Sequence, residues 1–223
     1  VVDFEPKKYV RPRKSLKVMS RSIQLAFASA HMAIEQACIS TAGISPDRYG
    51  VVFGVIMGTG VGGGVVFKGQ LHSGRQNIGG EWGHNILELD GPDCYCGHKG
   101  CVETLISGPG LTADFQRHGG SSTLAASDIV VLAEQGDVLA EAVMQRFFDR
   151  FGRAMAMVVN ILDPDAIILG GGLSNVERLY SEGRARIAHY VFNDELITPI
   201  LKNVHGDSSG VRGAAQLWRS DEI

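Results

Sequence analysis

Residues 51–69 read VVFGVIMGTGVGGGVVFKG and predict the part of the fold around which the rest of the chain is arranged. The run 51–57 is apolar and β-branched, which is typical of a buried strand. The glycine-rich segment GTGVGGG (58–64) follows it, and a turn is expected at Lys68-Gly69. The prediction is an antiparallel meander with strands at 51–57, 64–67 and 70–72.

Beyond the meander, helices predicted from apolar spacing alternate with short strands. SDIVVLAEQG lies between a serine cap and a glycine stop, and a long helix from Ala140 must end near Asp163-Pro164. AIILG (166–170) is a short buried strand that runs into three glycines. The elements expected here are helices at 127–136, 140–162, 175–191 and 210–218, and strands at 166–170 and 198–204. This order predicts an α/β fold with a mixed sheet flanked by helices.

Composition narrows the class of protein. The chain has 223 residues, 44% of them hydrophobic, and a formal net charge of −3. It contains no apolar run of the ~20 residues that a membrane span needs, and its first residues are too charged for a secretory signal. We therefore expect a cytoplasmic protein without membrane contact. Of its 29 glycines, 18 fall between Gly54 and Gly120, and 73–110 is expected to form a functional loop region.

The N-terminal part differs from the rest in charge. Residues 1–21 hold seven basic and two acidic side chains, whereas the remainder holds 14 basic and 22 acidic ones. We expect an irregular arm over 1–15 and a helix over 20–38, with Cys38 on its apolar face. A basic arm is compatible with nucleic-acid binding. A second recognition helix is not predicted, however, and this disfavours a nucleic-acid partner.

The strongest local motif is CYCGHKGC (94–101), preceded by a histidine at position 84. Three thiolates and one imidazole suit a tetrahedral zinc ion, and four protein ligands make such a site structural. The alternative is that the three cysteines are reduced and bind no ion. His98 lies within the same motif and is a weaker candidate ligand than His84. The predicted zinc ligands are His84, Cys94, Cys96 and Cys101.

Two glycine loops follow predicted strands and are candidates for phosphate binding through backbone N–H groups. GTGVGGG lacks the GK[ST] ending of a Walker motif, and a strand follows it where a dinucleotide fingerprint requires a helix. A tight hairpin at the first loop and a close helix crossing at the second are the structural alternatives. The candidate residues are Gly58, Thr59, Gly60, Gly170, Gly171 and Gly172.

Two carboxylates flank the metal motif. Glu81 lies three residues before His84, and Glu103 lies two residues after Cys101. Carboxylates accept hydrogen bonds from sugar hydroxyls, and a metal-bound imidazole keeps a second nitrogen to offer a ligand. Solvated surface is the alternative for either glutamate. We expect the metal to fix both ends of this loop and to bring Glu81, His84 and Glu103 together.

The motifs GTGVGGG, GEWGH (80–84), CYCGHKGCVET (94–104) and DPDAIILGGGLSN (163–175) together resemble the ROK family of repressors and sugar kinases. The sequences GEWGHN, ETLISG and HGDSSGVRGAAQLW look most like its bacterial fructokinase branch. The resemblance implies an actin-like, ribonuclease-H-like ATPase fold over residues 53–223. It also implies a hexose substrate contacted by Glu81, His84 and Glu103, ATP with Mg²⁺ at the glycine loops, structural Zn²⁺, and a homodimer.

One departure from the family pattern concerns catalysis. Family kinases begin with a D-x-G-x-T phosphate loop and later carry an Asn-Asp pair, whose aspartate takes the proton from the sugar hydroxyl. Before the GTG loop this chain has only Asp3 and Asp47, and neither lies in such a motif. We therefore expect no catalytic base in these residues, a weakened affinity for ATP with Mg²⁺, and weak or absent kinase turnover. A non-catalytic sugar-binding or dimerisation module is the alternative.

A second resemblance concerns the start of the chain. DFEPKKYVRPRKSLKVMSRSIQLAFASAHMAIEQA and AGISPDRYGVVFG are similar to an N-terminal segment of β-ketoacyl-(acyl carrier protein) synthases, over residues 2–54. The similarity ends before that family's catalytic residues, so condensing chemistry is not implied. We therefore expect a chimera, with a helix-strand fragment at 1–52 joined to a kinase domain at 53–223.

Overall fold

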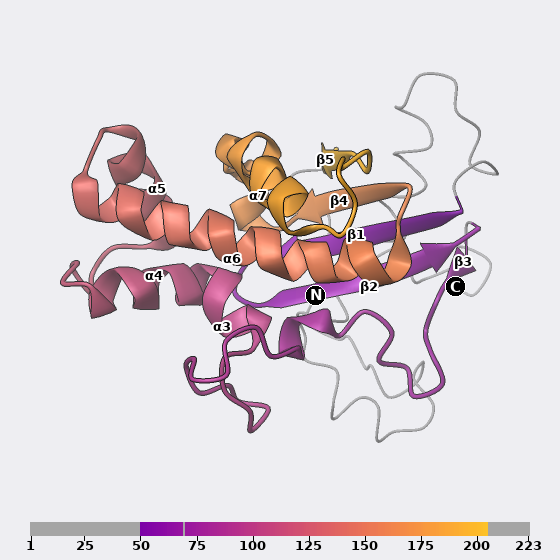
Figure 1. Cartoon of the computed structure of the whole chain (residues 1–223). Coiled ribbons are helices and arrows are strands. Elements are labelled where there is room, and N and C mark those ends of the chain that lie inside the picture. The colour runs from indigo at the N-terminus through magenta and orange to yellow at the C-terminus, as the bar shows by residue number, and fades with distance from the viewer. Residues whose placement is uncertain (1–49, 69, 205–223) are drawn as a thin grey trace, which may run out of the picture.

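The computed structural model describes residues 50–68 and 70–204. Within them a five-stranded sheet has the order β3-β2-β1-β4-β5 (Figure 1). The strands are β1 (Val51–Met57), β2 (Val61–Phe67), β3 (Gln70–Leu71), β4 (Ala166–Gly170) and β5 (Ile200–Lys202). The arm at 1–15 and the helices predicted at 20–38 and 210–218 lie outside the described residues.

The predicted meander is confirmed, but its second strand begins earlier than expected. β1 pairs antiparallel with β2, with Met57 opposite Val61, and parallel with β4, with Ile56 opposite Gly170. The glycines at 62–64 therefore belong to a strand. A Cβ atom on Gly63 would lie 2.8 Å from Trp82, so glycine here admits a close approach of another segment. The loop between the strands contains only residues 58–60.

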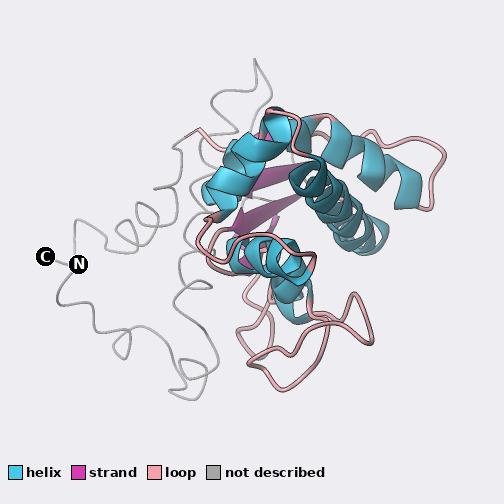
Figure 2. Cartoon of the chain, turned by 90° about the vertical axis from the view of Figure 1, so that its left-hand side faces the viewer, coloured by secondary structure: helices cyan, strands magenta, loops and turns pink. Residues whose placement is uncertain are grey.

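Helices follow the meander and pack against the sheet, with the long helix α6 beside the strands (Figure 2). The α-helices are α3 (Val102–Ile106), α4 (Gly108–Arg117), α5 (Ala126–Glu134), α6 (Val138–Leu162) and α7 (Glu182–Tyr190). Short 3-10 helices are η3 (Trp82–His84), η4 (Gly172–Asn175) and η5 (Glu177–Tyr180). The end of α6 is as predicted: Asp163 takes a left-handed conformation (φ 41°) directly before Pro164.

Two predicted segments differ from the structure. Residues 73–110 are not all loop, because α3 and the start of α4 lie within them. Ser107 caps α4 by accepting a hydrogen bond from the backbone N–H of Gly110 at 3.0 Å. The glycines around Pro109 lower helix propensity and conceal this helix in the sequence pattern.

The helix predicted over 175–191 is shorter than expected. Residues 172–180 form two 3-10 turns around the end of β4, and only α7 continues as an α-helix. The hydroxyl of Ser174 donates to the carbonyl of Gly171 at 2.6 Å, and Tyr180 donates to the carbonyl of Ser174 at 2.8 Å. These side-chain bonds compete with helical pairing and hold the chain against the strand.

Alternation along the strands divides the apolar side chains between the two faces of the sheet. On β1 and β4, Phe53, Val55, Ile167 and Leu169 join the main core with α6, α5 and α7. Val52 and Ile168 are among the residues of a second, smaller buried cluster. Helix α6 contributes twelve buried residues at helical spacing, so it is the main support of the sheet.

Within the described part of the chain, no helix is both long enough and apolar enough to cross a membrane.

Candidate functional site

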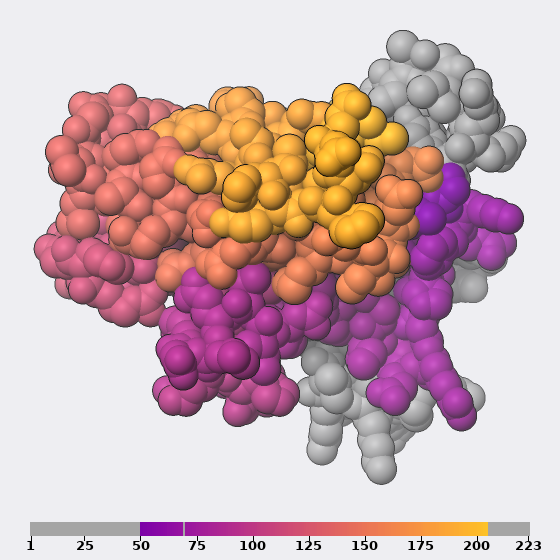
Figure 3. Space-filling model, viewed as in Figure 1, coloured from indigo at the N-terminus to yellow at the C-terminus, as the bar shows by residue number. Residues whose placement is uncertain are grey.

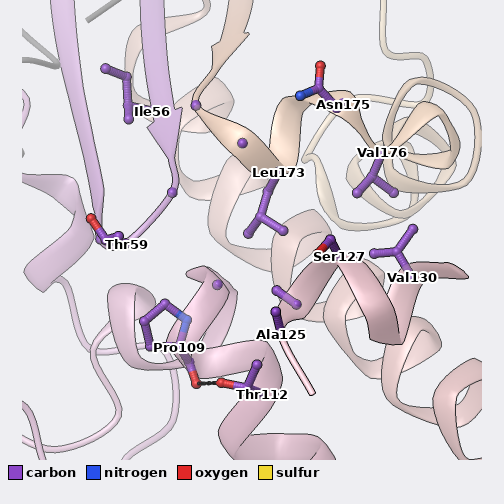
Figure 4. A pocket seen from close by; sticks show the side chains of 16 residues that line it. Ile56, Thr59, Pro109, Thr112, Ala125, Ser127, Val130, Leu173, Asn175 and Val176 are labelled. Atoms are coloured by element: carbon purple, nitrogen blue, oxygen red, sulfur yellow. Dashed lines mark hydrogen bonds between the residues drawn. The ribbon is translucent and has the colours of Figure 1, made fainter. Parts of the chain in front are cut away.

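A cavity of about 870 Å³ lies at the carboxyl ends of the adjacent parallel strands β1 and β4 (Figure 4). Ligands of open α/β sheets bind at this edge. Both glycine loops predicted from the sequence contribute to its lining, through Gly58, Thr59, Gly60, Gly171 and Gly172. Gly170 is the last residue of β4 and does not line the cavity. A Cβ atom on Gly58 would lie 4.0 Å from the backbone nitrogen of Gly172, so the two loops lie side by side.

The remaining lining combines polar and apolar groups in a way that suits a nucleotide. The first turns of α4 and α5 border the cavity with Pro109 and Ser127 among others. Backbone N–H groups at helix N-termini attract anions. Leu173, Val176 and Val130 line the same space (Figure 4) and offer an apolar surface for a flat ring.

The loops depend on glycine because the backbone is crowded. Gly171 has φ +79°, and a Cβ atom on it would lie 2.5 Å from the carbonyl oxygen of Met57. The backbone N–H of Gly108, at the start of α4, donates to the carbonyl of Gly58 at 2.8 Å. The first glycine loop is therefore held directly by the helix that borders the cavity.

The four predicted metal ligands meet in the segment that projects below the helices (Figures 1 and 3). One donor atom from each of His84, Cys94, Cys96 and Cys101 lies within 4.8 Å of the others. The Cys94 thiol is 3.6 Å from Nδ1 of His84, and the Cys96 and Cys101 thiols are 3.6 Å apart. A tetrahedral ion with Zn–S bonds of ~2.3 Å places its sulfur ligands ~3.8 Å apart. The cluster could therefore hold a metal ion.

Backbone hydrogen bonds fold the chain around this cluster. The N–H of Cys94 donates to the carbonyl of His98 at 2.8 Å, and Gly97 turns the chain with φ +94°. His98 is outside the four-residue cluster, although its Nδ1 lies 3.5 Å from the Cys96 thiol. Gly100 has no alternative, since a Cβ atom there would overlap the carbonyl oxygen of Glu88.

The two flanking glutamates lie near each other at the start of β2. Burial and the negative charge of Glu103 raise the pKa of Glu81 to about 7. Oε1 of Glu81 is buried without a hydrogen-bond partner among the described residues. The backbone N–H of Val61 donates to Oε2 of Glu103 at 2.9 Å. The second ring nitrogen of His84, Nε2, lies 2.9 Å from the Tyr95 hydroxyl.

Residues 80–103 carry the four predicted metal ligands and both glutamates, and we call them the metal segment. A group of charged side chains that the sequence pattern does not predict joins this segment to the helices. Arg150 of α6 donates to Glu88 from Nε at 2.9 Å, and its Nη1 lies 3.4 Å from Asp114 of α4. Burial alone would raise the pKa of Asp114, but hydrogen bonds from Arg146 and Arg117 and the charge of Arg150 lower it. Arg117 lies three residues after Asp114 on the same helix, a spacing that the sequence shows, but Arg146 and Arg150 come from α6 and no spacing in the sequence pairs them with Asp114.

Comparison with known proteins agrees with this geometry. The pattern of the ROK family matches residues 45–221, and the chain belongs to this family. N-acetyl-D-glucosamine kinase of Yersinia pseudotuberculosis is 40% identical over 187 residues, covering 78% of this chain and 60% of the kinase. The chain thus spans about 60% of the length of the curated relatives that it matches.

Solved structures share the fold. A ROK family glucokinase from Streptomyces griseus, in complex with glucose and AMPPNP, has a TM-score of 0.73 and 26% identity, covering 85% of this chain and 66% of that one. A ROK family transcriptional regulator, a homolog of the Escherichia coli Mlc protein, has a TM-score of 0.68 and 26% identity, covering 85% and 49%. The fold is therefore the actin-like ATPase fold of ROK sugar kinases, as predicted.

The comparisons bear differently on the two resemblances seen in the sequence. The family match begins at residue 45, inside the segment 2–54 that resembles condensing enzymes. No support for that second resemblance, or for a chimera, comes from these comparisons. The boundary at residue 53 stays a prediction, and so does the fructokinase branch, since the relatives named above are N-acetyl-D-glucosamine kinases.

Proposed function

We propose that this chain is the nucleotide- and sugar-binding part of an ATP-dependent hexose kinase. The observation that carries the proposal is the position of the two sites. Gly60 lines the cavity together with both glycine loops, and the backbone N–H of the next residue, Val61, donates to the carboxylate of Glu103, two residues after Cys101. A phosphate donor and a sugar acceptor bound at these places would be neighbours, as phosphoryl transfer requires.

The residues divide the work by their chemistry. Backbone N–H groups of the two glycine loops and of α4 and α5 suit the phosphates of ATP, whose charge Mg²⁺ would offset. Glu81, His84 and Glu103 suit sugar hydroxyls, and the partnerless oxygen of Glu81 favours a ligand that donates a hydrogen bond. Thiolate and imidazole donors select Zn²⁺ for the four-residue cluster, where the ion would be structural because all four positions are protein ligands.

N-acetyl-D-glucosamine is the sugar that we propose first, because the curated relative from Yersinia pseudotuberculosis is named as a kinase of this sugar. Glucose is the sugar in the Streptomyces structure, and the sequence motifs suggested fructose. All three sugars present several hydroxyl donors to a carboxylate pair. Because the three sugars differ in shape and substituents, measuring the affinity of the chain for each of them discriminates among the three.

The proposal includes slow turnover by these 223 residues. None of the described residues that line the cavity is acidic, and residues 1–57 contain neither D-x-G-x-T nor an Asn-Asp pair. Without the Asn-Asp aspartate that takes the proton from the sugar hydroxyl in family kinases, general-base catalysis of ~10²–10⁴-fold is lost. Assembly as a homodimer is a further part of the proposal, which light scattering of the purified chain tests.

Titration calorimetry with AMPPNP·Mg²⁺ and with each of the three sugars tests binding, and an ADP-release assay tests transfer. We expect saturable binding of nucleotide and of N-acetyl-D-glucosamine, with turnover far below the ~1–100 s⁻¹ of ordinary kinases. Failure to bind either ligand contradicts the proposed function. Turnover in the ordinary range contradicts the inference that no catalytic base is present.

A sugar-responsive, non-catalytic module is the second candidate function. It is favoured by the structural likeness to the ROK transcriptional regulator and by the absence of acidic side chains from the described cavity lining. The same calorimetry discriminates between the two candidates. Sugar binding without nucleotide binding or ADP formation indicates the module.

A further inference from the structure

Glu103 links two parts of the molecule that are distant in sequence. It is the second residue of α3, two residues after the metal-cluster cysteine Cys101. Its Oε2 accepts a hydrogen bond from the backbone N–H of Val61 at 2.9 Å, although the two residues are 42 positions apart. Val61 begins β2 and directly follows Gly60, which lines the cavity.

The rest of the metal segment presses on the same stretch of β2. A Cβ atom on Gly83 would overlap the carbonyl oxygen of Val61, and one on Gly80 would overlap the carbonyl oxygen of Gly63. Both ends of the metal segment therefore meet the start of β2. Gly80 and Gly83 pack against backbone carbonyls of β2, and Glu103 accepts a hydrogen bond from the backbone N–H of Val61.

The loop that lines the cavity is held at both ends. At its start, the carbonyl of Gly58 accepts the backbone N–H of Gly108 at 2.8 Å. At its far end, the next residue, Val61, donates to Glu103 at 2.9 Å. Two of the three loop residues, Gly58 and Gly60, are glycines, which permit several backbone conformations. Inside the loop the backbone N–H of Gly58 donates to the carbonyl of Gly60 at 2.9 Å, and the Glu103 contact fixes Val61, the residue that directly follows this turn.

We propose that Glu103 is a positioning residue for the phosphate loop 58–60, and that through it a bound sugar raises the affinity for nucleotide. The inference rests on the proposed function, since it takes the loop to bind phosphate and Glu103 to bind sugar. One carboxylate oxygen is held by Val61, and the other is left to accept a sugar hydroxyl. A sugar held there fixes the carboxylate and favours the loop conformation in which the Val61 bond is made.

Energetic coupling of this kind is reciprocal. If sugar favours the loop conformation that binds nucleotide, nucleotide must raise the affinity for sugar by the same factor. Both ligands act on one element, the segment from Gly58 to Val61, so no longer pathway is needed. Glu134 offers a control, because it is an exposed carboxylate at the end of α5 that lines neither the cavity nor the proposed sugar site.

The test measures AMPPNP·Mg²⁺ affinity by calorimetry, first without sugar and then at saturating N-acetyl-D-glucosamine. Three variants of the full chain are compared with the unaltered protein. Glu103→Ala removes the acceptor for Val61, Glu103→Gln keeps a carbonyl acceptor in its place, and Glu134→Ala removes an exposed carboxylate that belongs to neither proposed site. Circular dichroism and zinc content establish that each variant is folded and metal-loaded.

We expect Glu103→Ala to weaken nucleotide binding about tenfold without any sugar present, as loss of a charge-assisted hydrogen bond allows. Glu103→Gln should restore most of this affinity, and the control variant Glu134→Ala should not change it. Saturating sugar should raise nucleotide affinity about fivefold in the unaltered protein and in Glu134→Ala, but not in Glu103→Ala.

Amide hydrogen exchange of Val61 gives a readout that needs no ligand. Exchange should be faster in Glu103→Ala than in Glu103→Gln, because only the second variant keeps a partner for this N–H. Unchanged nucleotide affinity and unchanged Val61 exchange in Glu103→Ala overturn the inference while leaving the proposed function in place. Failure of the unaltered protein to bind nucleotide or sugar overturns the proposed function itself.

Discussion

The guanidinium of Arg150 donates from Nε to Oε1 of Glu88 at 2.9 Å and thereby joins the long helix α6 to the metal segment. The Arg150 side chain is 13% exposed and also lies against Asp114, whose side chain is 3% exposed. The bond connects the main core to the segment that carries the metal ligands and both glutamates. Placement of the proposed sugar site thus depends on a charged contact inside the fold.

Replacing Arg150 with methionine should destabilise the protein markedly. The change leaves Asp114 and Glu88 with fewer cationic partners, and breaking such a buried pair costs about 3 kcal/mol. Urea unfolding measures the change. Lys202→Met is the control, because its pair with Glu177 is 41% and 74% exposed and should contribute less than about 1 kcal/mol. Equal stabilities of the two variants would show that the buried group adds nothing.

Alanine variants of His84 and His98 test which of the two histidines is a metal ligand and which is only a neighbour of the cluster. His84→Ala should abolish zinc binding, because a tetrahedral site loses one of its four ligands. His98→Ala should retain about one zinc ion per chain, since His98 lies outside the cluster. Elemental analysis of the purified variants gives the stoichiometry. Loss of zinc from His98→Ala and its retention in His84→Ala would reverse the assignment.

Two neighbouring glycines in the cavity should respond differently to alanine. Gly171→Ala places a Cβ atom 2.5 Å from the carbonyl of Met57 at φ +79°, and should destabilise the protein by about 2 kcal/mol. Gly172→Ala meets nothing within 4 Å, and its effect should stay within about 0.5 kcal/mol. Thermal unfolding measures both. Similar melting temperatures for the two variants would contradict the close approach of the second loop to β1.

Acid sensitivity should depend on Glu141. A hydrogen bond from Arg178, with a second from Gln145, lowers the pKa of Glu141 from its ordinary value of 4.5 to about 2. A carboxyl whose pKa is lower in the folded state stabilises the fold above its unfolded pKa, and this stability is lost as pH falls toward the folded value. Between pH 5 and pH 2 the unaltered protein should therefore lose more stability than Glu141→Gln. Parallel melting curves over this range would show that the pair contributes little.

Local features of the fold were predictable because their causes are local. β-branched residues at 51–57 and 166–170 form strands wherever apolar cover exists, and apolar spacing fixed the long helix up to Asp163. Helix α4 escaped prediction because Gly108 and Gly110 surround Pro109 in its first turn. The helix expected from 175 was interrupted because Ser174 and Tyr180 bond to the backbone around β4.

The candidate site shows the same division. Spacing alone indicated the metal cluster, since its three cysteines lie within eight residues. That the glycine loops at 58–60 and 171–172 share one cavity follows from the parallel pairing of β1 with β4, which no local pattern specifies. The contact of Glu103 with Val61 and those of Arg146 and Arg150 with Asp114 likewise depend on tertiary packing.

The most direct test of the account is the affinity for N-acetyl-D-glucosamine before and after removal of zinc by a chelator, followed by zinc addition. The four predicted metal ligands join η3, which contains His84, to the start of α3, which follows Cys101, and these elements carry or adjoin the proposed sugar contacts. Removal should weaken sugar binding at least about tenfold, and restored zinc should recover it. Sugar binding that is equally tight in the zinc-free protein would contradict the central claim that this cluster positions the sugar site.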